Sequence, residues 1–282
     1  MSEDFEHLRE WVGRKELRKD VASAWPLAAL AATLDDAGVS TDAGAPIAPG
    51  WHWIFFLDAK PPSELGSDGH PQRGGFMPPV PLPRRMWAGG KLEFLRPLKV
   101  GDAITRESEI VSVEPKTGRT GTLVFVTVRH TIAGSEGTAI VEQQDIVYRE
   151  AAKKGDPQPP GKAAPQGPQW KRDVMPDTVM LFRYSALTFN GHRIHYDRDY
   201  ALGEEHYPGL VVHGPLQATL LLDLCRNNAR APLTSFEYRA QHPVFAGCAL
   251  TVNGNFDAAG SKADVWTAND AGHYAMRGTA TF

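Results

Sequence analysis

Cysteine is scarce in this chain of 282 residues: only Cys225 and Cys248 are present. Neither belongs to a CxxC pair, and no cysteines and histidines cluster at the spacing of a zinc finger. The pattern therefore argues against a disulfide scaffold and against a structural zinc site. We expect both cysteines to be small core residues.

Long apolar runs are absent as well. The amino-terminal segment MSEDFEHLREWVGRKELRKD is charged throughout and lacks the apolar region of a signal peptide. No later stretch is long and apolar enough to span a bilayer. These absences predict a cytoplasmic protein that does not contact membranes.

A strong charge of one sign is also missing. Thirty lysines and arginines stand against thirty-three aspartates and glutamates, which gives a formal net charge of -3. Such a chain has no global positive field to attract nucleic acid or an anionic membrane. We expect no nucleic-acid partner.

The chain does contain enough apolar material for a large core, at 42% hydrophobic residues. Its composition changes at 150–173, where five prolines and three glycines interrupt the apolar pattern. That stretch predicts a semi-extended linker. We therefore expect an N-terminal domain at 1–150, a linker at 151–173 and a C-terminal domain at 174–282.

The two halves share a motif and a similar order of expected elements. Residues 96–102 (RPLKVGD) resemble residues 242–248 (HPVFAGC), and an apolar strand-like run follows each. Each half is expected to place one apolar helix before a run of antiparallel strands, with the sheet wrapped around that helix. We predict a duplicated α+β unit with its site at the seam between the halves.

Periodicity and turn residues give the expected bounds of these elements. In the first half we expect a helix at Asp20–Ala37, a strand at Trp51–Phe56, a long loop at Ala59–Gly90, and strands at Lys91–Phe94, Ala103–Val113, Thr122–Ala133 and Thr138–Arg149. In the second half we expect a helix that begins after His213-Gly214-Pro215, and strands at Thr234–Ala240, Ala249–Ala258, Lys262–Asn269 and His273–Phe282.

The segment RYSALTFNGHRIHYDRDYA, residues 183–201, carries a family resemblance. It resembles the hydratase motif of the MaoC-like hydratases and dehydratases, whose pattern is roughly S/T-G-D-x-N-P-I-H-x-D-x-x-Y-A. The positions that match in register are Thr188, Ile194, His195, Asp197, Tyr200 and Ala201. Residues 211–214 (VVHG) resemble the start of the family's central helix.

The stretch FMPPVPLPRRMWAGGKLEF, residues 76–94, makes the resemblance narrower. Together with the hydratase motif it is similar to the branch of 3-methylfumaryl-CoA (mesaconyl-C4-CoA) hydratase and type 2 hydroxyacyl-thioester dehydratase. The resemblance implies a double hot-dog fold, in which each of two antiparallel sheets wraps a central helix. It further implies a FAS1-like dehydratase domain first and a MaoC-like domain with the catalytic motif second.

One position departs from the family pattern. Asn190 stands where these hydratases have an aspartate, five residues before the catalytic histidine. An amide forms hydrogen bonds but cannot exchange a proton near neutral pH. The usual pair of acid and base is therefore incomplete in this segment, while the histidine is retained.

The proposed chemistry needs a base for water, a proton donor for the α-carbon and a stabilised enolate oxygen. We assign the base to His195, the positioning of water to Asn190 and the polarisation of the thioester carbonyl to the backbone N–H of Gly214. The alternatives are a structural hydrogen bond for His195 and a purely steric role for Gly214. Asp197 is expected to be a supporting or turn residue.

Three arginines are candidates to bind a free carboxylate on the acyl group of the substrate. Arg193 lies beside the catalytic residues in sequence, and Arg84 and Arg85 lie in the proline-rich loop. The alternatives are surface arginines or partners for the phosphates of coenzyme A.

The remaining candidates shape the pocket. Trp87 and Tyr184 are expected to wall the acyl group or to pack in the core, and His192 to contact substrate or to cap a turn. No metal is expected, because the spacing of the nearby acidic and imidazole groups matches no recognised ligand pattern. The set considered was His192, His195, Asp197 and His206.

The leading expectation is reversible hydration of an enoyl thioester without a cofactor, most specifically 3-methylfumaryl-CoA. Itaconyl-CoA and a 3-hydroxyacyl group on an acyl-carrier protein stay open as substrates. A thioesterase and a non-catalytic acyl-CoA binding protein stay open as other classes, because fold alone does not decide function. A homodimer is compatible with the duplicated chain.

Overall fold

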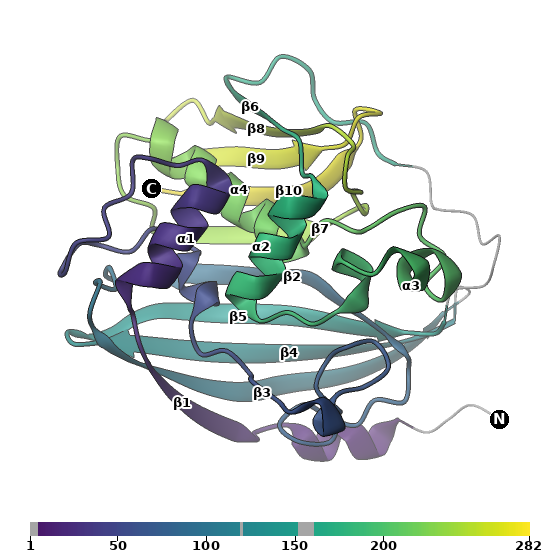
Figure 1. Ribbon diagram of the computed structural model, residues 1–282. Helices are drawn as coiled ribbons and strands as arrows, with labels where there is room; N and C mark the ends of the chain where they lie inside the picture. The colour runs from purple at the N-terminus through teal and green to yellow at the C-terminus, as the bar shows by residue number, and fades with distance from the viewer. Residues whose placement is uncertain (1–4, 119–120, 152–160) are drawn as a thin grey trace.

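The computed structural model describes residues 5–118, 121–151 and 161–282. Its centre is one antiparallel sheet with the strand order β1-β3-β4-β5-β2-β7-β10-β9-β8-β6. The sheet curves around helices that lie on one of its faces (Figure 1). The strands are β1 (Lys15–Val21), β2 (Arg84–Phe94), β3 (Ala103–Gly118), β4 (Gly121–Gly134), β5 (Gly137–Arg149), β6 (Trp170–Val174), β7 (Ser235–Ala240), β8 (Leu250–Phe256), β9 (Lys262–Ala268) and β10 (Tyr274–Thr281).

The helices follow the same numbering. The α-helices are α1 (Ala24–Leu34), α2 (Thr178–Thr188), α3 (Arg198–Gly203) and α4 (Gly214–Asn228), and the 3-10 helices are η1 (Glu6–Trp11), η2 (Trp51–Ile54), η3 (Pro62–Glu64) and η4 (Arg193–His195).

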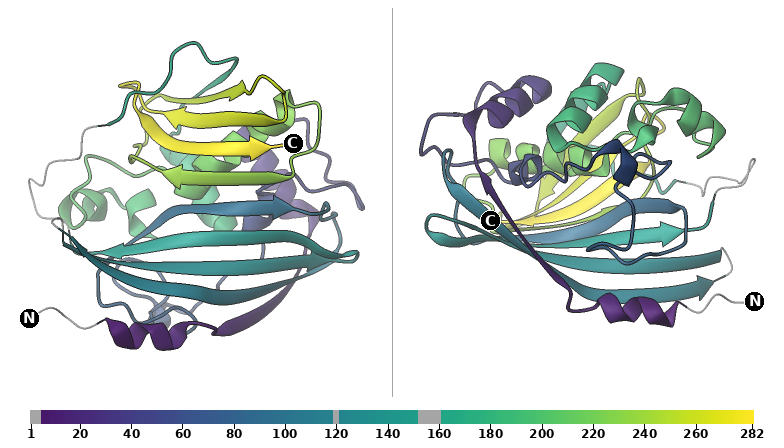
Figure 2. Two further views of the ribbon diagram at one scale, coloured as in Figure 1. Left: turned by 180° about the vertical axis from the view of Figure 1, so that it is seen from behind. Right: turned by 60° about the horizontal axis from the view of Figure 1, so that its bottom comes forward.

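The two halves of the chain meet where β2 pairs with β7. The register runs from Gly89 opposite Arg239 to Glu93 opposite Ser235. A β-carbon on Gly90 would lie 2.3 Å from the carbonyl oxygen of Gln143, so only glycine fits at this close approach. The two expected sheets, one from each half, join edge to edge through this pair into one continuous sheet, visible from behind in Figure 2.

Helix α4 is the central helix of the second half. It packs against β2 and against every strand from β6 to β10, and all residues from Leu216 to Cys225 are buried. Pro215 stands in its first turn, where the missing N–H costs no hydrogen bond. The sequence-based expectation for this helix is confirmed.

Among the described residues of the first half, no helix takes the central place of α4, which corrects the expectation of a central helix at Asp20–Ala37. Helix α1 is shorter and packs against α2 and the short helix η2. Helix η2 occupies Trp51–Ile54, so the expected strand at Trp51–Phe56 is wrong. Trp51, Phe55 and Phe56 are buried in the core rather than paired in a sheet.

Several bounds also differ from the expected ones. Strand β1 occupies part of the charged amino-terminal segment, and β2 begins at Arg84 rather than at Lys91. The expected linker ends in strand β6, which pairs with β8 at the sheet edge, and its residues 152–160 lie outside the described part of the chain. Within the described residues, no helix combines the length and apolarity needed to cross a bilayer. The division into two domains stays a prediction.

Candidate active site

A cavity of about 1060 Å³ lies between the two halves. Strand β2 and the loop before it line it from the first half, while α2, the segment at 189–195 and the start of α4 line it from the second. Eight of the nine residues singled out from the sequence line this cavity. They are Arg84, Arg85, Trp87, Tyr184, Asn190, His192, His195 and Gly214.

His195 ends helix η4 and is buried, with 7% of its surface exposed. Its Nδ1 lies 2.7 Å from the carbonyl oxygen of Val211. A carbonyl oxygen can only accept, so Nδ1 carries the proton and Nε2 of the neutral ring has a free lone pair. Burial lowers the pKa of His195 to about 4. The ring is therefore a neutral base at neutral pH.

Gly214 begins helix α4 beside His195. Its N–H belongs to the first helical turn, which has no partner inside the helix. A β-carbon on Gly214 would lie 3.0 Å from the ring of Trp87. Because residue 214 is a glycine, the indole of Trp87 can pack close to the start of α4.

Asn190 makes a local turn. Its Oδ1 accepts the backbone N–H of His192 at 3.0 Å. This bond fixes the orientation of the side-chain amide. The NH₂ group and the second lone pair of Oδ1 remain to contact water or substrate.

The arginines differ in what they already bind. Arg84 donates to Glu205 at 2.6 Å, and both side chains are buried. Arg193 donates to Asp197 at 2.7 and 2.9 Å and to the carbonyl oxygen of Ser67. The side chain of Arg85 makes no hydrogen bond or ion pair with any residue that the structure describes, and it lines the large cavity.

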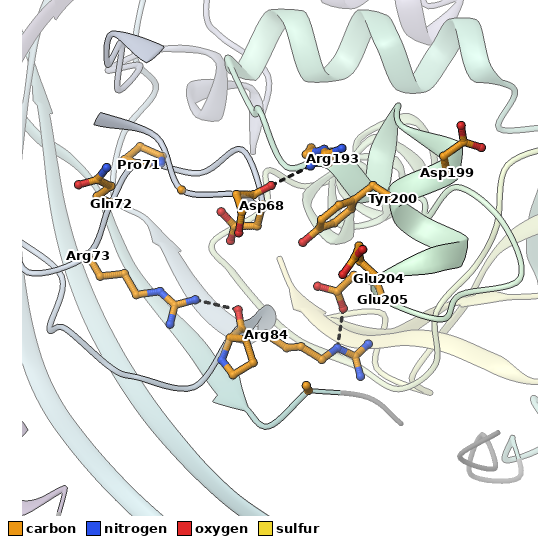
Figure 3. Close-up of a pocket in the computed structure, with 14 residues that line it drawn as sticks. Asp68, Pro71, Gln72, Arg73, Arg84, Arg193, Asp199, Tyr200, Glu204 and Glu205 are labelled. Carbon is orange, nitrogen blue, oxygen red and sulfur yellow. Dashed lines mark hydrogen bonds and ion pairs between the residues drawn. The ribbon is translucent and has the colours of Figure 1, made fainter. Parts of the chain in front are cut away.

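Arg193 lines a second cavity of about 850 Å³ (Figure 3). Asp68, Arg73, Tyr200 and Glu205 lie around the same space. Arg193 is outside the lining of the large cavity, and its guanidinium is paired with Asp197. The assignment of Arg193 to an acyl carboxylate stays a prediction, and within the large cavity Arg84 and Arg85 are the arginines of the expected set.

Trp87 and Tyr184 form walls of the large cavity. The ring of Trp87 stacks on Tyr238 with centroids 4.5 Å apart and meets Trp53 edge-on at 5.6 Å. The hydroxyl of Tyr184 lies 3.4 Å from that of Thr219 on α4. Both aromatic residues are thus fixed by packing while they face the cavity.

The part of the cavity lined by the first half carries buried polar groups. Glu142 on β5 lies 3.1 Å from Nε2 of His52 and accepts the indole N–H of Trp53 at 2.8 Å. Arg106 on β3 lines the same region, and its buried Nε has no hydrogen-bond partner among the described residues. This end of the cavity suits polar ligand atoms better than a long alkyl chain.

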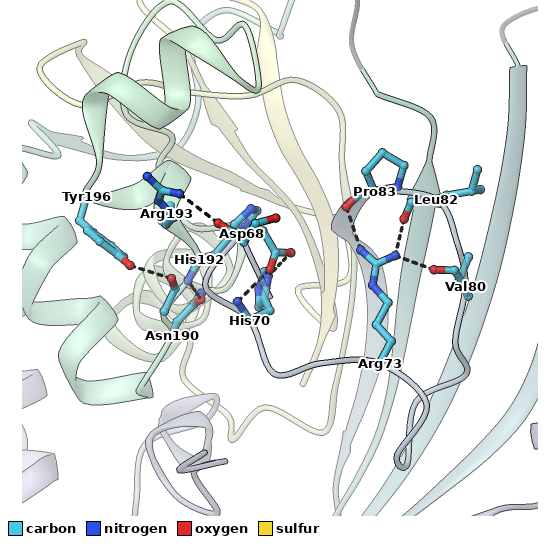
Figure 4. A network of polar contacts seen from close by, with 12 residues as sticks. Asp68, His70, Arg73, Val80, Leu82, Pro83, Asn190, His192, Arg193 and Tyr196 are labelled. Atoms are coloured by element: carbon cyan, nitrogen blue, oxygen red, sulfur yellow. Dashed lines mark hydrogen bonds and ion pairs between the residues drawn. The ribbon is translucent and has the colours of Figure 1, made fainter. Parts of the chain in front are cut away.

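The sequence reasoning missed the pair Asp68 and His70. Both residues stand in the loop before β2, and His70 lies next to His192 with ring centroids 4.3 Å apart (Figure 4). His70 lines the large cavity. The one local signal was the Asp-x-His spacing within a glycine-rich loop, but nothing in it indicates a contact more than 120 residues further along the chain.

The residues considered for a metal in the sequence analysis were His192, His195, Asp197 and His206. Asp197 of that group accepts the N–H of Tyr200 at the start of α3 and pairs with Arg193. Among the described residues, one group brings possible ligand atoms within 4.8 Å of one another, namely Asp68, His70 and His192. The Asp68 carboxylate is already hydrogen-bonded to the His70 ring.

Comparisons with known proteins identify the family of this chain. The sequence pattern of the hydroxyacyl-thioester dehydratase type 2 family matches residues 50–246. Mesaconyl-C(4)-CoA hydratase of Chloroflexus aurantiacus is 49% identical over 236 residues, which cover 83% of this chain and 84% of the relative. The mitochondrial hydroxyacyl-thioester dehydratase type 2 of Schizosaccharomyces pombe is 31% identical and covers 84% of this chain and 89% of the relative.

Solved structures show the same fold. A MaoC-like dehydratase superposes with a TM-score of 0.73 at 14% identity, covering 97% of this chain and 99% of its own. A Mycobacterium tuberculosis protein described as a double hot-dog fold superposes with a TM-score of 0.58 at 15% identity, covering 96% of each chain. The predicted double hot-dog fold is thus confirmed. The chain belongs to the hydroxyacyl-thioester dehydratase type 2 family.

Proposed function

We propose that this protein is a hydro-lyase that reversibly adds water to the double bond of 3-methylfumaryl-CoA (mesaconyl-C4-CoA). The 49% identity to a mesaconyl-C(4)-CoA hydratase supports the substrate. The observation that carries the chemistry is the placement of His195 and Gly214 on one cavity, with the unprotonated Nε2 of His195 available as a base.

The addition begins with a water molecule between His195 and the substrate. Nε2 of His195 takes a proton from water while the oxygen bonds to the β-carbon. The electrons of the double bond move toward the thioester, and the N–H of Gly214 stabilises the enolate oxygen. The NH₂ group of Asn190 supports the position of the water. A further group must give a proton to the α-carbon, and the amide of Asn190 cannot supply it.

The acyl group of this substrate carries a free carboxylate on its β-carbon. Arg85 is the cation of the large cavity that we assign to that carboxylate, because Arg84 and Arg193 are paired with Glu205 and Asp197. The walls formed by Trp87 and Tyr184 enclose the short carbon chain.

A short polar acyl group also fits the far end of the cavity. Glu142 and His52 are almost fully buried there, and a long alkyl chain would remove water from polar groups without replacing the hydrogen bonds. This argues against the long acyl chains that a dehydratase acting on acyl-carrier protein would accept. Itaconyl-CoA, with its carboxylate on a short chain, is the nearest alternative substrate.

The experiment combines two signals for each substrate. The purified protein is incubated with mesaconyl-C4-CoA, itaconyl-CoA and crotonyl-CoA, while absorbance follows the conjugated thioester and a thiol reagent follows free coenzyme A. We expect loss of conjugation without free thiol, fastest with mesaconyl-C4-CoA. Free thiol would indicate a thioesterase. If neither signal changes with any substrate, the remaining explanations are a substrate carried by acyl-carrier protein and a non-catalytic binding protein.

Three companion expectations belong to the same proposal. The enzyme needs no cofactor beyond its coenzyme A substrate, so treatment with a chelator should leave the rate unchanged. The cytoplasmic location and the homodimer stay predictions. Cell fractionation and light scattering of the purified protein test them directly.

A further inference from the structure

The loop at 66–72 is fastened to the segment that carries the hydratase motif. The backbone N–H of Arg193 donates to the carbonyl oxygen of Asp68 at 2.9 Å, and the Arg193 side chain donates to that of Ser67 at 3.1 Å. A β-carbon on Gly69, whose φ is +86°, would lie 1.9 Å from the carbonyl oxygen of Gly191. The first half of the chain therefore inserts a fixed loop into the site.

This loop presents a carboxylate and an imidazole as a pair. Oδ1 of Asp68 accepts the backbone N–H of His70 at 3.0 Å, and Oδ2 lies 3.1 Å from its Nδ1. The carboxylate is an acceptor, so Nδ1 carries a proton and Nε2 is the nitrogen left for chemistry. His70 lines the large cavity while Asp68 lines the second one, so the carboxylate stands behind the imidazole.

Three imidazoles from both halves stand in a row at the cavity. The ring of His70 lies 4.3 Å from that of His192, and His192 lies 5.6 Å from His195. Asn190, which replaces the expected aspartate, lies beside His192 in the same network (Figure 4). An imidazole backed by a carboxylate thus stands near the position where the motif lacks an acid.

We propose that His70, oriented by Asp68, is the second catalytic residue and exchanges the proton of the α-carbon. The inference rests on the proposed hydration. It assigns His195 to the oxygen of water and His70 to carbon. Asp68 is a positioning residue that holds the Nδ1–H tautomer and stabilises the imidazolium.

The step balances as follows in the direction of hydration. His195 takes one proton from water, and the resulting hydroxide bonds to the β-carbon. The π electrons shift to the α-carbon and the thioester oxygen, and the Nε2–H of the His70 imidazolium delivers a proton to the α-carbon. After product leaves, His195 loses its proton to solvent and His70 regains one, so that no other reactant is consumed.

Charged groups around His70 make its proton sensitive to substrate. Burial lowers the pKa of His70 to about 4, and the charge of Arg85 and, more weakly, Arg73 adds to this effect, while Asp68 opposes it. His192 stands against the ring as a further titratable neighbour. A substrate carboxylate on Arg85 cancels that positive charge, so binding of the dicarboxylic substrate favours the imidazolium that the reaction needs.

The test distinguishes the role of His195 at the oxygen of water from the role of His70 at the α-carbon. His70→Gln, Asp68→Asn and His195→Asn are compared with His273→Gln, a control histidine outside both cavities. Each is assayed for hydration of mesaconyl-C4-CoA and, in D₂O, for deuterium uptake at the α-carbon of the saturated substrate analogue by mass spectrometry. Circular dichroism and thermal melting confirm that each variant folds.

We expect His70→Gln to lose both hydration, by about 10²- to 10⁴-fold in kcat, and α-carbon exchange. Asp68→Asn should lose both to a smaller extent. His195→Asn should lose hydration and keep exchange, which a merely structural role of His70 would not produce. If the folded His70→Gln variant hydrates mesaconyl-C4-CoA at the rate of the control variant, or exchanges the α-carbon proton as the wild type does, the inference is wrong. The proposed hydratase function would still hold.

Two other results would also overturn the inference. If the wild-type protein hydrates none of the thioesters, the proposed function fails and the role of His70 fails with it. If the purified enzyme contains stoichiometric metal that Asp68→Asn loses, and hydration depends on that metal, Asp68 and His70 hold an ion rather than a proton. Metal content is measured by mass spectrometry in the same preparations.

Discussion

The imidazole of His195 lies flat against that of His213, with ring centroids 3.7 Å apart and planes 19° from parallel. Nε2 of His213 lies 2.8 Å from the hydroxyl of Ser185 on α2. Burial, and the neighbouring His195, keep the pKa of His213 well below its usual range. Both stacked rings are therefore neutral at neutral pH. His195 then has no positive charge from His213 beside it.

The first prediction concerns His195 as the base. His195→Asn should lower kcat for hydration of mesaconyl-C4-CoA by about 10²- to 10⁴-fold, because general base catalysis is removed. The KM should change little, since the ring is assigned to water rather than to coenzyme A. Steady-state kinetics measure both values. Near-normal turnover in a folded variant would refute the assignment.

The second prediction concerns stability at acid pH. The pKa values of His195, His70 and His130 are each lowered to about 4, chiefly by burial. The unfolded chain binds these protons near pH 6.5, so the free energy of unfolding should fall between pH 6.5 and 4, by roughly 1.4 kcal/mol per pH unit for each group. Asp223 has the opposite effect on the free energy of unfolding, because burial raises its pKa to about 7. It is one group against the three histidines.

Urea unfolding at several pH values tests this dependence. His130 hydrogen-bonds Ser108 and lies outside both cavities, so His130→Asn is a matched variant. Its unfolding free energy should depend less steeply on pH than that of the wild type. An equal slope in both proteins would contradict the prediction.

The third prediction concerns the substrate carboxylate. Arg85→Gln should lower kcat/KM for mesaconyl-C4-CoA by about 10- to 100-fold, because a hydrogen bond to a charged group contributes about 1.5–3 kcal/mol. The value for crotonyl-CoA, which has no carboxylate, should change far less. Arg129→Gln is the control, because Arg129 pairs with Glu109 outside the cavity. An equal loss with both substrates would assign Arg85 to coenzyme A instead.

The fourth prediction concerns the junction of the halves. Gly90→Ala should lower the free energy of unfolding by about 1–3 kcal/mol, because the added methyl group meets the backbone of Gln143 and the hydroxyl of Tyr238. Gly203→Ala in α3 is the control, since a β-carbon there meets nothing within 4 Å. Thermal melting of both variants measures the difference. A normal melting temperature for Gly90→Ala would mean that β2 can shift.

The sequence was most informative where the signals are local. The hairpins from β3 to β5 follow alternating apolar residues and glycine turns, and α4 follows a continuous apolar pattern behind Pro215. Strands β1 and β6 were missed because they are short, charged edge strands with alternating exposure. A charged edge protects a sheet from unwanted pairing, and it also hides the strand from a hydrophobicity pattern.

The candidate site was predicted only in part for a different reason. The motif around His195 is contiguous, so its residues could be found from their spacing. The contact between His70 and His192 depends on the backbone approach of Gly69 to Gly191. Neither the register of that approach nor the ion pair that occupies Arg193 leaves a signal in local sequence.

The pairing of β2 with β7 has a consequence for how the chain is made. Strand β2 is complete long before the ribosome has added residues 235–240, and until then its outer edge has no neighbour. An unpaired strand edge in a growing chain is a site of aggregation. During synthesis the first half therefore presents an edge of β2 that gains its partner only after more than 140 further residues have been added.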